Sequence, residues 1–333
     1  MSVRRALALC LGGALSLLVL PAASAATTTC AGAEATHVGT DAPDTIVGTD
    51  GDDVIVALEG RDVISAGDGD DVVCGGRHAD VVNGGDGDDL LRGGRGPDVL
   101  DGFDDLAAER GGEGDDELHG GADTDVVFGV AGNDSLFGEG GSDILQGGSG
   151  DDSLDGGLEV DFADFSSAGS GVVVSLGRAS AAGEGADSLH DIEGVYGSLH
   201  ADELSGDADA NQLYGSDGND VVHGAEGDDL LEGDGGNDTL HGGEGADRLD
   251  DYNTFGRDGL YGERGDDHLN TMDGVPGNDS AAGGDGSDTC SADAEDDLTT
   301  CEVIAASRET AARADRMHRR AGMLRALLAL SRS

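Results

Sequence analysis

Apolar side chains recur at one position in every nine along most of this chain. From Gly39 to Asp164 the sequence divides into fourteen consecutive blocks of nine residues, and the eighth position is Ile, Leu or Val in twelve of them. Neighbouring side chains in a strand point to opposite faces, so a short strand centred on that position directs one side chain to an interior. The pattern therefore predicts three-residue strands that each add one aliphatic side chain to a thin core.

The polar positions of each block predict a tight turn. Glycine fills the first position in twelve blocks and the fourth in nine, and aspartate fills the sixth in thirteen. Glycine admits the positive-φ conformations that a sharp reversal requires. Two blocks then form one coil of eighteen residues, and successive coils stack as parallel strands about 4.8 Å apart. We expect two sheets that face each other across the aliphatic side chains.

A second array has the same period and runs from Gly197 to Asp250 in six blocks. Between the arrays, GVVVSL at 171–176 predicts a strand, and we expect this linker to continue the stack. Looser blocks follow the second array around Asp258, Asp266, Asp279 and Asp288.

Composition by itself favours disorder. The 333 residues include 61 glycines and 70 acidic side chains against 18 basic ones, all arginine, so the formal net charge is −52. Low hydrophobicity with high net charge is typical of chains that cannot bury enough apolar surface to fold. The period argues against this interpretation, because a disordered segment does not require a phase held over fourteen blocks. The charge also argues against nucleic acid as a partner, since phosphates attract basic proteins.

The N-terminus has the pattern of a signal peptide. Arg4 and Arg5 precede an apolar run at 6–20, and Ala23-Ser24-Ala25 supplies small residues for cleavage. The run is too short for a stable membrane span. The sequence therefore predicts a secreted chain, extracellular or associated with the cell envelope, with no transmembrane segment after cleavage.

Export determines how the cysteines are interpreted. Four remain after residue 25, and an oxidising compartment favours disulfides. Three pairings are open, and we favour Cys30 with Cys74 and Cys290 with Cys301, because each pair would tie down one end of the stack. A zinc site is the weaker alternative, since the sequence has no CxxC pair.

Stacking places the sixth-position aspartates above one another at intervals of eighteen residues. Carboxylates at that spacing repel one another, and a hard divalent cation between neighbouring turns would reverse the sign. A flexible site made only of oxygen atoms suits calcium better than magnesium or zinc. The pattern thus predicts calcium as the ligand, with binding coupled to folding because the core is thin.

Four blocks carry a resemblance to a known family: GGDGDDLLR at 84, GGEGDDELH at 111, GGSGDDSLD at 147 and GGEGADRLD at 242. They resemble the nonapeptide repeat of the RTX family of secreted calcium-binding proteins. The resemblance implies an all-β parallel β-roll, a right-handed β-solenoid, with calcium ions along both edges. In some similar rods, regular Thr and Asn rows bind ice, but the third positions here are charged, for example Asp50 and Arg77, which disfavours that activity.

The predicted calcium ligands are sixth-position aspartates. His78 and Asp123 replace the fourth-position glycine before Asp80 and Asp125, so we expect those two turns to be weaker sites, and Ala107 removes a ligand. The segment 102–110 is predicted to be a bulged or ion-free turn. The predicted ligands are Asp53, Asp62, Asp71, Asp89, Asp98, Asp116, Asp134, Asp143, Asp152, Asp220, Asp229, Asp238 and Asp247.

Catalytic motifs are missing from the sequence. It has no HExxH motif, no lysine and no G-x-S-x-G motif, so we expect no enzyme activity. The alternative is a secreted enzyme or toxin-like protein whose repeats support a cryptic catalytic segment within 157–196. His223 and His241 occupy ninth positions eighteen residues apart and should stack on one outer face, as polar surface side chains rather than a transition-metal site.

The C-terminal tail has a different character. Residues 307–333 contain seven arginines and an apolar stripe, which favours a short basic amphipathic helix. Capping of the acidic stack, attachment to an anionic envelope surface, and disorder remain open. The predicted organisation is a signal peptide (1–25), an N-terminal cap (26–38), a first array (39–164), linker strands (165–196), a second array (197–300) and a C-terminal cap with the basic tail (301–333).

Overall fold

A computed structural model of the chain describes residues 28–101, 114–251, 256–275, 277–293, 295–301 and 303–304. The predicted signal peptide (1–25), the predicted bulged turn at 102–110 and the predicted basic helix at 307–333 lie outside these residues. Within the described residues, no helix has the length and hydrophobicity needed to cross a membrane.

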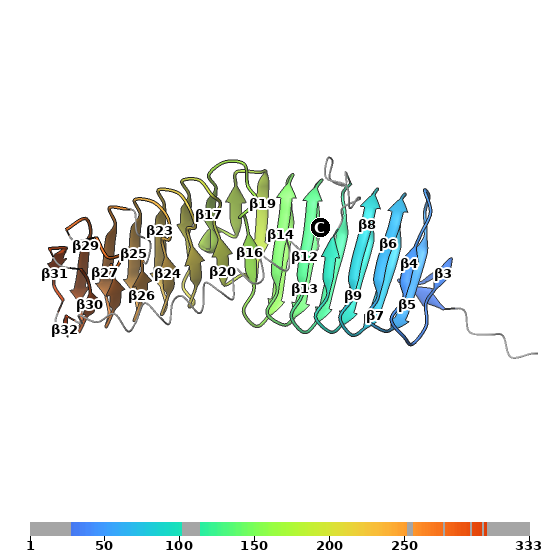
Figure 1. The fold of residues 1–333 in the computed structure, drawn as a ribbon, viewed down its shortest axis with the longest axis horizontal. Helices are drawn as coiled ribbons and strands as arrows, with labels where there is room; N and C mark the ends of the chain where they lie inside the picture. Colours follow the sequence, from blue (N-terminus) through green and yellow to red (C-terminus); the bar gives the residue numbers. More distant parts are fainter. Residues whose placement is uncertain are drawn as a thin grey trace, which may run out of the picture.

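The described chain forms a long stack of coils with two facing sheets, of 16 and 14 strands (Figure 1). A separate two-stranded antiparallel pair, β1 (Thr29–Cys30) and β2 (Ala33–Glu34), precedes the stack. The 16-stranded sheet consists of β3 (His37–Val38), β5 (Val54–Glu59), β7 (Val72–Arg77), β9 (Leu90–Arg95), β11 (Glu117–Ala122), β13 (Ser135–Gly140), β15 (Ser153–Leu158), β17 (Val173–Ser175), β18 (Ser180–Ala182), β19 (Ala186–His190), β21 (Glu203–Ser205), β23 (Val221–Glu226), β25 (Thr239–Glu244), β27 (Gly259–Arg264), β29 (Ser280–Asp285) and β31 (Asp297–Thr299). The 14-stranded sheet consists of β4 (Thr45–Val47), β6 (Val63–Asp68), β8 (Val81–Asp86), β10 (Val99–Asp101), β12 (Val126–Ala131), β14 (Ile144–Ser149), β16 (Phe162–Asp164), β20 (Gly194–Tyr196), β22 (Gln212–Tyr214), β24 (Leu230–Glu232), β26 (Arg248–Asp250), β28 (His268–Asn270), β30 (Thr289–Ser291) and β32 (Val303–Ile304).

Strand register confirms the predicted coil. Val54 pairs with Val72 and Leu136 pairs with Leu154, each eighteen residues on and in parallel. Many strands are longer than predicted, because the first three positions of the next block pair as well, as in Gly76 with Gly94. The eighth-position side chains form the core: Ile55, Leu91 and Leu136 are 0% exposed. One aliphatic row from each sheet therefore makes a core that is thin but continuous.

The pairing register shifts once within the first array. Leu91 in β9 pairs with Leu118 in β11, and Leu100 in β10 pairs with Val127 in β12, offsets of 27 residues rather than 18. The strands on either side of residues 102–113 are therefore separated by nine residues more than one two-block coil. This placement puts Asp116, and not position 107, above Asp89 in the stack.

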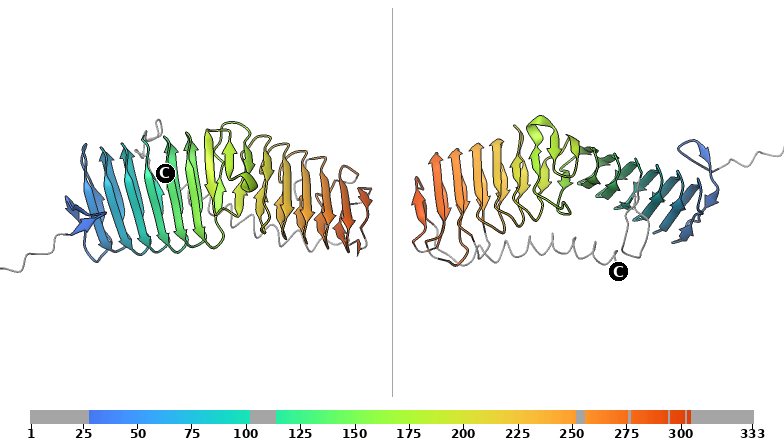
Figure 2. Two further views of the ribbon diagram at one scale, coloured as in Figure 1. Left: turned by 180° about the vertical axis from the view of Figure 1, so that it is seen from behind. Right: turned by 90° about the horizontal axis from the view of Figure 1, so that it is seen from above.

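The linker continues the stack, as expected, but with one reversed strand, β18. β17 is antiparallel to β18, and β18 is antiparallel to β19, so the order in the 16-stranded sheet is β15-β19-β18-β17-β21. A 3₁₀ turn, η1 (Leu176–Arg178), joins β17 to β18. The 14-stranded sheet passes directly from β16 to β20. Two strands are thus added to one sheet only, and the stack changes direction there (Figure 2).

Both predicted disulfides are confirmed. Cys30 is bonded to Cys74 and Cys290 to Cys301, each with a Cα–Cα distance of 5.8 Å. The first bond ties the β1–β2 pair to β7, and the second ties β30 to the chain just after β31. Each bond therefore restrains one end of the stack that the structure describes.

Candidate metal centres

The sixth-position aspartates form two rows, one along each edge of the stack. In each row, the Oδ1 atom of one aspartate accepts the backbone N–H of its equivalent in the preceding coil, as in Asp71 N to Asp89 Oδ1 at 2.8 Å. The edge before the 16-stranded sheet carries Asp53, Asp71, Asp89, Asp116, Asp134, Asp152, Asp187, Asp202, Asp220, Asp238, Asp258 and Asp279. The edge before the 14-stranded sheet carries Asp44, Asp62, Asp80, Asp98, Asp125, Asp143, Asp161, Glu193, Asn211, Asp229, Asp247, Asp267 and Asp288.

In most of these aspartates the second carboxylate oxygen is buried and, within the described part of the chain, receives no hydrogen bond. Asp143 and Asp125, for example, are 0% exposed. Burying an ionised oxygen without a partner costs several kcal/mol, so this atom requires a proton or a cation. The aspartates with such an Oδ2 include Asp62, Asp71, Asp80, Asp89, Asp98, Asp125, Asp134, Asp143, Asp152, Asp161, Asp220, Asp229, Asp238, Asp247 and Asp267.

Glycine at the first position leaves the space beside that oxygen open. A Cβ atom on Gly138 would lie 2.5 Å from Asp143 Oδ2 and 2.5 Å from the carbonyl oxygen of Gly156 in the next coil. Gly75 has the same surroundings, with Asp80 Oδ2 and the Gly93 oxygen each at 2.9 Å. The position that a side chain would fill is thus lined by a carboxylate and a backbone carbonyl from two consecutive coils.

The other turn glycines bring further carbonyl groups close. Gly85 and Gly87 have φ of 112° and 140°, and a Cβ atom at either would collide with the carbonyl oxygen of Gly67 or Gly69 in the preceding coil. All of these neighbouring groups are oxygen ligands in a flexible turn, the donor set that calcium prefers. The residues present therefore fit calcium ions between successive turns.

The electrostatics agree with this fit. Burial raises the pKa of Asp71 and of Asp80 to about 6. Burial also raises the pKa of Asp89 to about 8, against the hydrogen bond from Asp71 and with a contribution from the charge of Asp116. When no cation is bound, the carboxyl groups of each row thus lose their protons at a higher pH than a free aspartate does.

A family model describing the RTX calcium-binding nonapeptide repeat matches the sequence at 38–73, 47–82, 75–100, 110–136, 128–163, 196–231, 223–250 and 270–298, more than half of the chain. The chain belongs to the RTX calcium-binding nonapeptide repeat family. No relative was found among curated proteins. Among solved structures, the chain is similar to a hyperactive, Ca2+-dependent, β-helical antifreeze protein from an Antarctic bacterium, with 17% sequence identity, a TM-score of 0.32 and coverage of 79% of this chain and 81% of that one.

Asp53 differs from the other predicted ligands of this RTX chain. Its Oδ1 accepts the Thr36 hydroxyl at 2.8 Å, and its Oδ2 accepts the N–H and hydroxyl of Thr49 at 2.7 and 2.9 Å. Burial raises the pKa of Asp53, but these hydrogen bonds and His37 outweigh it and leave the pKa lowered. Protein donors thus satisfy both oxygens of a carboxylate that the sequence predicts to bind calcium.

The second position of the block explains this difference. Thr40 and Thr49 replace the usual glycine, and Thr40 also donates its N–H and hydroxyl to Asp44 Oδ2. At the start of the second array, Ser198 donates its N–H to Asp202 Oδ2 and its hydroxyl to Asp202 Oδ1. A hydroxyl side chain at the second position thus caps the row carboxylate at the start of each array. Ser216 holds the same position before Asp220 but donates to the Gly197 oxygen, and Asp220 Oδ2 receives no hydrogen bond from the described residues.

The two turns expected to be weaker have the regular geometry. His78 and Asp123 adopt φ of 82° and 84° at the fourth position, where glycine is usual. Asp80 and Asp125 keep their places in the row, each with a buried Oδ2. The neighbouring coils therefore hold these side chains in a backbone conformation that costs about 1 kcal/mol or more.

Several row members were missing from the predicted ligands. Asp187 comes from the linker, and Asp267 takes the place that the sequence assigned to Asp266. Asp161 and Asp258 complete rows on either side of irregular segments. Asp161 is the sixth residue of its block, so the repeat itself identifies it. Asp187, Asp258 and Asp267 follow insertions that shift the nine-residue repeat.

The two stacked histidines are confirmed. The rings of His223 and His241 lie 4.7 Å apart, and Tyr261 follows at 4.9 Å on the same face. Burial and the neighbouring His241 lower the pKa of His223. Ring nitrogens in parallel stacked planes do not converge on a common point, so this column supports packing rather than metal binding.

Filling the space at Gly138 should weaken the calcium site at that turn. Gly138→Ala places a methyl group against Asp143 Oδ2 and the Gly156 oxygen, so we expect loss of calcium bound at that turn and a lower melting temperature in saturating calcium. The cost of overpacking is about 1–3 kcal/mol. Differential scanning calorimetry and a count of bound calcium measure both effects.

Gly51→Ala is the matched control. A Cβ atom on Gly51 would have nothing within 4 Å, and its φ is not positive. Its melting temperature and calcium count should match those of the unmodified chain. Equal effects of the two substitutions would contradict the role assigned to the space beside the carboxylate.

Proposed function

We propose that this RTX chain is an exported calcium-binding protein whose coils fold into a rigid rod when calcium binds, with a structural, surface or adhesive role outside the cytoplasm. The observation that carries the proposal is the pair of aspartate rows with a buried Oδ2 that receives no hydrogen bond among the described residues. The N-terminal signal pattern supports export.

The thin core supports coupling between calcium and folding. Each block contributes one aliphatic side chain to the interior, while each turn buries a carboxylate. Full burial of one Val or Leu contributes about 1.5–3 kcal/mol, which is similar to the cost of one unpaired buried polar group. The free energy gained by burying the core and the free energy lost by burying the carboxylates therefore nearly cancel until a cation pairs with the carboxylates.

A calorimetric titration of the full chain tests the proposal. Calcium added to chelator-treated protein should bind to many sites, and the change in circular dichroism should follow the heat. Magnesium at the same concentration should produce little of either, because it requires tight octahedral geometry and keeps its waters. Absence of calcium binding, or equal binding of magnesium, would refute it.

We also propose that the chain is not an enzyme. The buried side chains of the linker are mainly apolar, including Phe165, Val172 and Val174, and its buried Asp187 accepts the Asp152 N–H. A surface groove lined by Pro97, Asp123, Thr124, Leu158 and Glu159 carries two carboxylates without a histidine or cysteine. Turnover by the purified protein that one substitution within 157–196 abolished would revive the catalytic alternative.

Ice binding is not part of the proposal. Most third-position side chains between residues 39 and 101 are exposed and charged, including Asp50, Asp68, Asp86, Arg77 and Arg95. Such a face orders water around ions and lacks a regular row of small hydroxyl groups. The outer surface is thus better suited to an ionic environment or to a charged partner.

A further inference from the structure

One turn of the second array has an irregular length. In a regular block, glycine at the first position is followed five residues later by the row aspartate, as in Gly233 and Asp238. After β26, Asp251 occupies the first position, and the next row aspartate, Asp258, comes seven residues later. The row itself is intact, because the Asp238 N–H donates to Asp258 Oδ1 at 2.9 Å.

The backbone shows that Asp251 takes the place of a glycine. First-position N–H groups donate to the ninth residue of the following coil, as Gly215 does to the Glu232 oxygen at 2.9 Å. Asp251 makes the same bond, to the Asn270 oxygen at 2.8 Å. The first position of this coil therefore carries a carboxylate.

At the first-position glycines of the neighbouring regular turns, an added side chain would lie against the row carboxylate. A Cβ atom on Gly215 would lie 2.6 Å from Asp220 Oδ2, and one on Gly233 would lie 2.9 Å from Asp238 Oδ2. In the block of Asp251, two more residues separate the first position from the row aspartate than in a regular block. The side chain of Asp251 is nevertheless buried, with 2% exposed.

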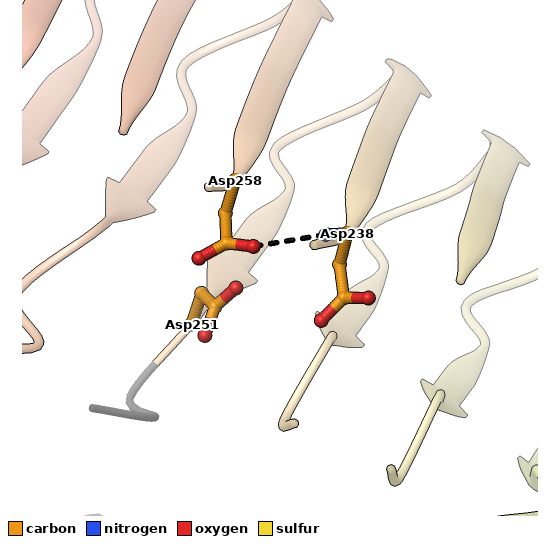
Figure 3. A group of neighbouring side chains, drawn as sticks. All are labelled: Asp238, Asp251 and Asp258. Atoms are coloured by element: carbon orange, nitrogen blue, oxygen red, sulfur yellow. Dashed lines mark hydrogen bonds between the residues drawn. The ribbon is translucent and has the colours of Figure 1, made fainter. Parts of the chain in front are cut away.

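Asp251 converges with two row aspartates. One carboxylate oxygen from each of Asp238, Asp251 and Asp258 lies within 4.8 Å of the others (Figure 3). Asp238 is 1% exposed and Asp258 is 4% exposed. Across the residues that the structure describes, no other three acidic, histidine or cysteine side chains meet this closely.

An independent observation marks this cluster as a ligand site. Asp238 Oδ2 is buried and receives no hydrogen bond from the described residues. A Cβ atom on Gly256 would lie 2.5 Å from Asp258 Oδ2 and against the carbonyl oxygen of Gly236, so a backbone oxygen lies beside the same carboxylates. Burial also raises the pKa of Asp258.

We propose that Asp238, Asp251 and Asp258 form a cation site of higher charge that holds one calcium ion more tightly than the regular turns do. A regular turn offers the carboxylates of two row aspartates, and this turn adds a third. Calcium affinity in proteins rises with the number of charged ligands and the rigidity of the site. The inference rests on the proposed calcium binding of the rows and adds an order of calcium affinity among the sites.

Calcium release from the loaded, folded protein tests this order. The full chain saturated with calcium is mixed rapidly with excess fluorescent chelator, and the release of ions is followed in time. Differences in affinity between related sites are mostly differences in dissociation rate. We expect one ion per chain to leave about tenfold more slowly than the rest, as a gain of one charged ligand predicts.

Three variants distinguish the outcomes. Asp251→Asn, which keeps the shape and removes one charge, and Asp251→Gly, which restores the residue of the regular repeat, should both lose the slow ion. Asp134→Asn, on the same edge and equally buried at 1% exposed, should lose faster ions and keep the slow one. Circular dichroism in saturating calcium establishes that each variant is folded, and Asp251→Gly serves as the test if the asparagine variant is not.

The result that overturns the inference differs from the result that overturns the proposed function. Persistence of the slow ion in both Asp251 variants, or its absence from the unmodified chain, refutes the tight site while calcium binding stands. A chain that carries no calcium to release refutes both.

Discussion

Removal of calcium should unfold the stack of coils. More than ten carboxylate oxygens are buried without a hydrogen bond from the described residues. At a cost of about 1–3 kcal/mol for each such group, their total exceeds the 5–15 kcal/mol net stability of a typical domain. The calcium-free chain therefore cannot keep these carboxylates ionised within a folded stack at neutral pH.

The change in size should be large and easy to measure. An unfolded chain of this length has a radius of gyration of about 60 Å, whereas coils spaced about 4.8 Å apart form a far more compact rod. Small-angle X-ray scattering and far-ultraviolet circular dichroism, with and without chelator, should report expansion and loss of β structure together. Readdition of calcium, but not of sodium at the same ionic strength, should restore both.

Retention of structure by the chelated protein would contradict this expectation. If the chelated protein kept its β signal, its radius and its melting temperature, the buried carboxylates would be stabilised by something other than a metal ion. The two disulfides would then be tested as the source of the calcium-independent stability, because each restrains the unfolded chain.

Lowering the pH should fold the calcium-free chain. Burial raises the pKa of Asp89, Asp125 and Asp220 to about 8, with a hydrogen bond opposing the shift and neighbouring aspartates adding to it. The same carboxyl groups in an unfolded chain titrate near 3.8. Protons therefore bind preferentially to the folded state, and each unit of difference corresponds to about 1.4 kcal/mol.

The sign follows from these pKa values. The stabilisation by protons is fully present below the unfolded pKa of 3.8 and is lost as the pH rises through the folded values of about 6 to 8. We expect the chelated chain to gain β structure as the pH falls from 8 to about 5, a range chosen to stay above the sequence pI of about 4.1. Circular dichroism at fixed ionic strength measures this gain.

Calcium-loaded protein is the control, because its response should be opposite. Bound calcium requires ionised carboxylates, and protons compete with it, so its melting temperature should fall over the same pH interval. If the chelated chain instead lost structure on acidification, the buried aspartates would not be the groups that limit its folding.

The sequence alone determined the repeating parts of the molecule. A period of nine residues specifies the coil, because the glycine turns, the aliphatic eighth position and the sixth-position aspartate each act within one block. Register, core rows and aspartate rows follow from repetition, as the pairing of Val54 with Val72 and of Leu136 with Leu154 illustrates. The cysteine pairing also followed, from the need to restrain both ends.

Features that depend on contacts between coils were decided by the tertiary structure. The pairing offset across residues 102–113 is 27 rather than 18 residues, and the linker adds one reversed strand, β18, to one sheet only. Asp53 fits the motif, but both of its oxygens are satisfied by Thr36 and Thr49. Asp251 lies outside the motif and joins two row aspartates.

The physical reason is the range of the interactions. Turn conformation and strand direction are set by residues within one block, so a local sequence pattern predicts them. Whether a carboxylate meets a hydroxyl group, a third carboxylate or an open space depends on which residues the stack brings together from blocks 17 to 27 positions apart. Those distances change with every insertion, and only the folded chain fixes them.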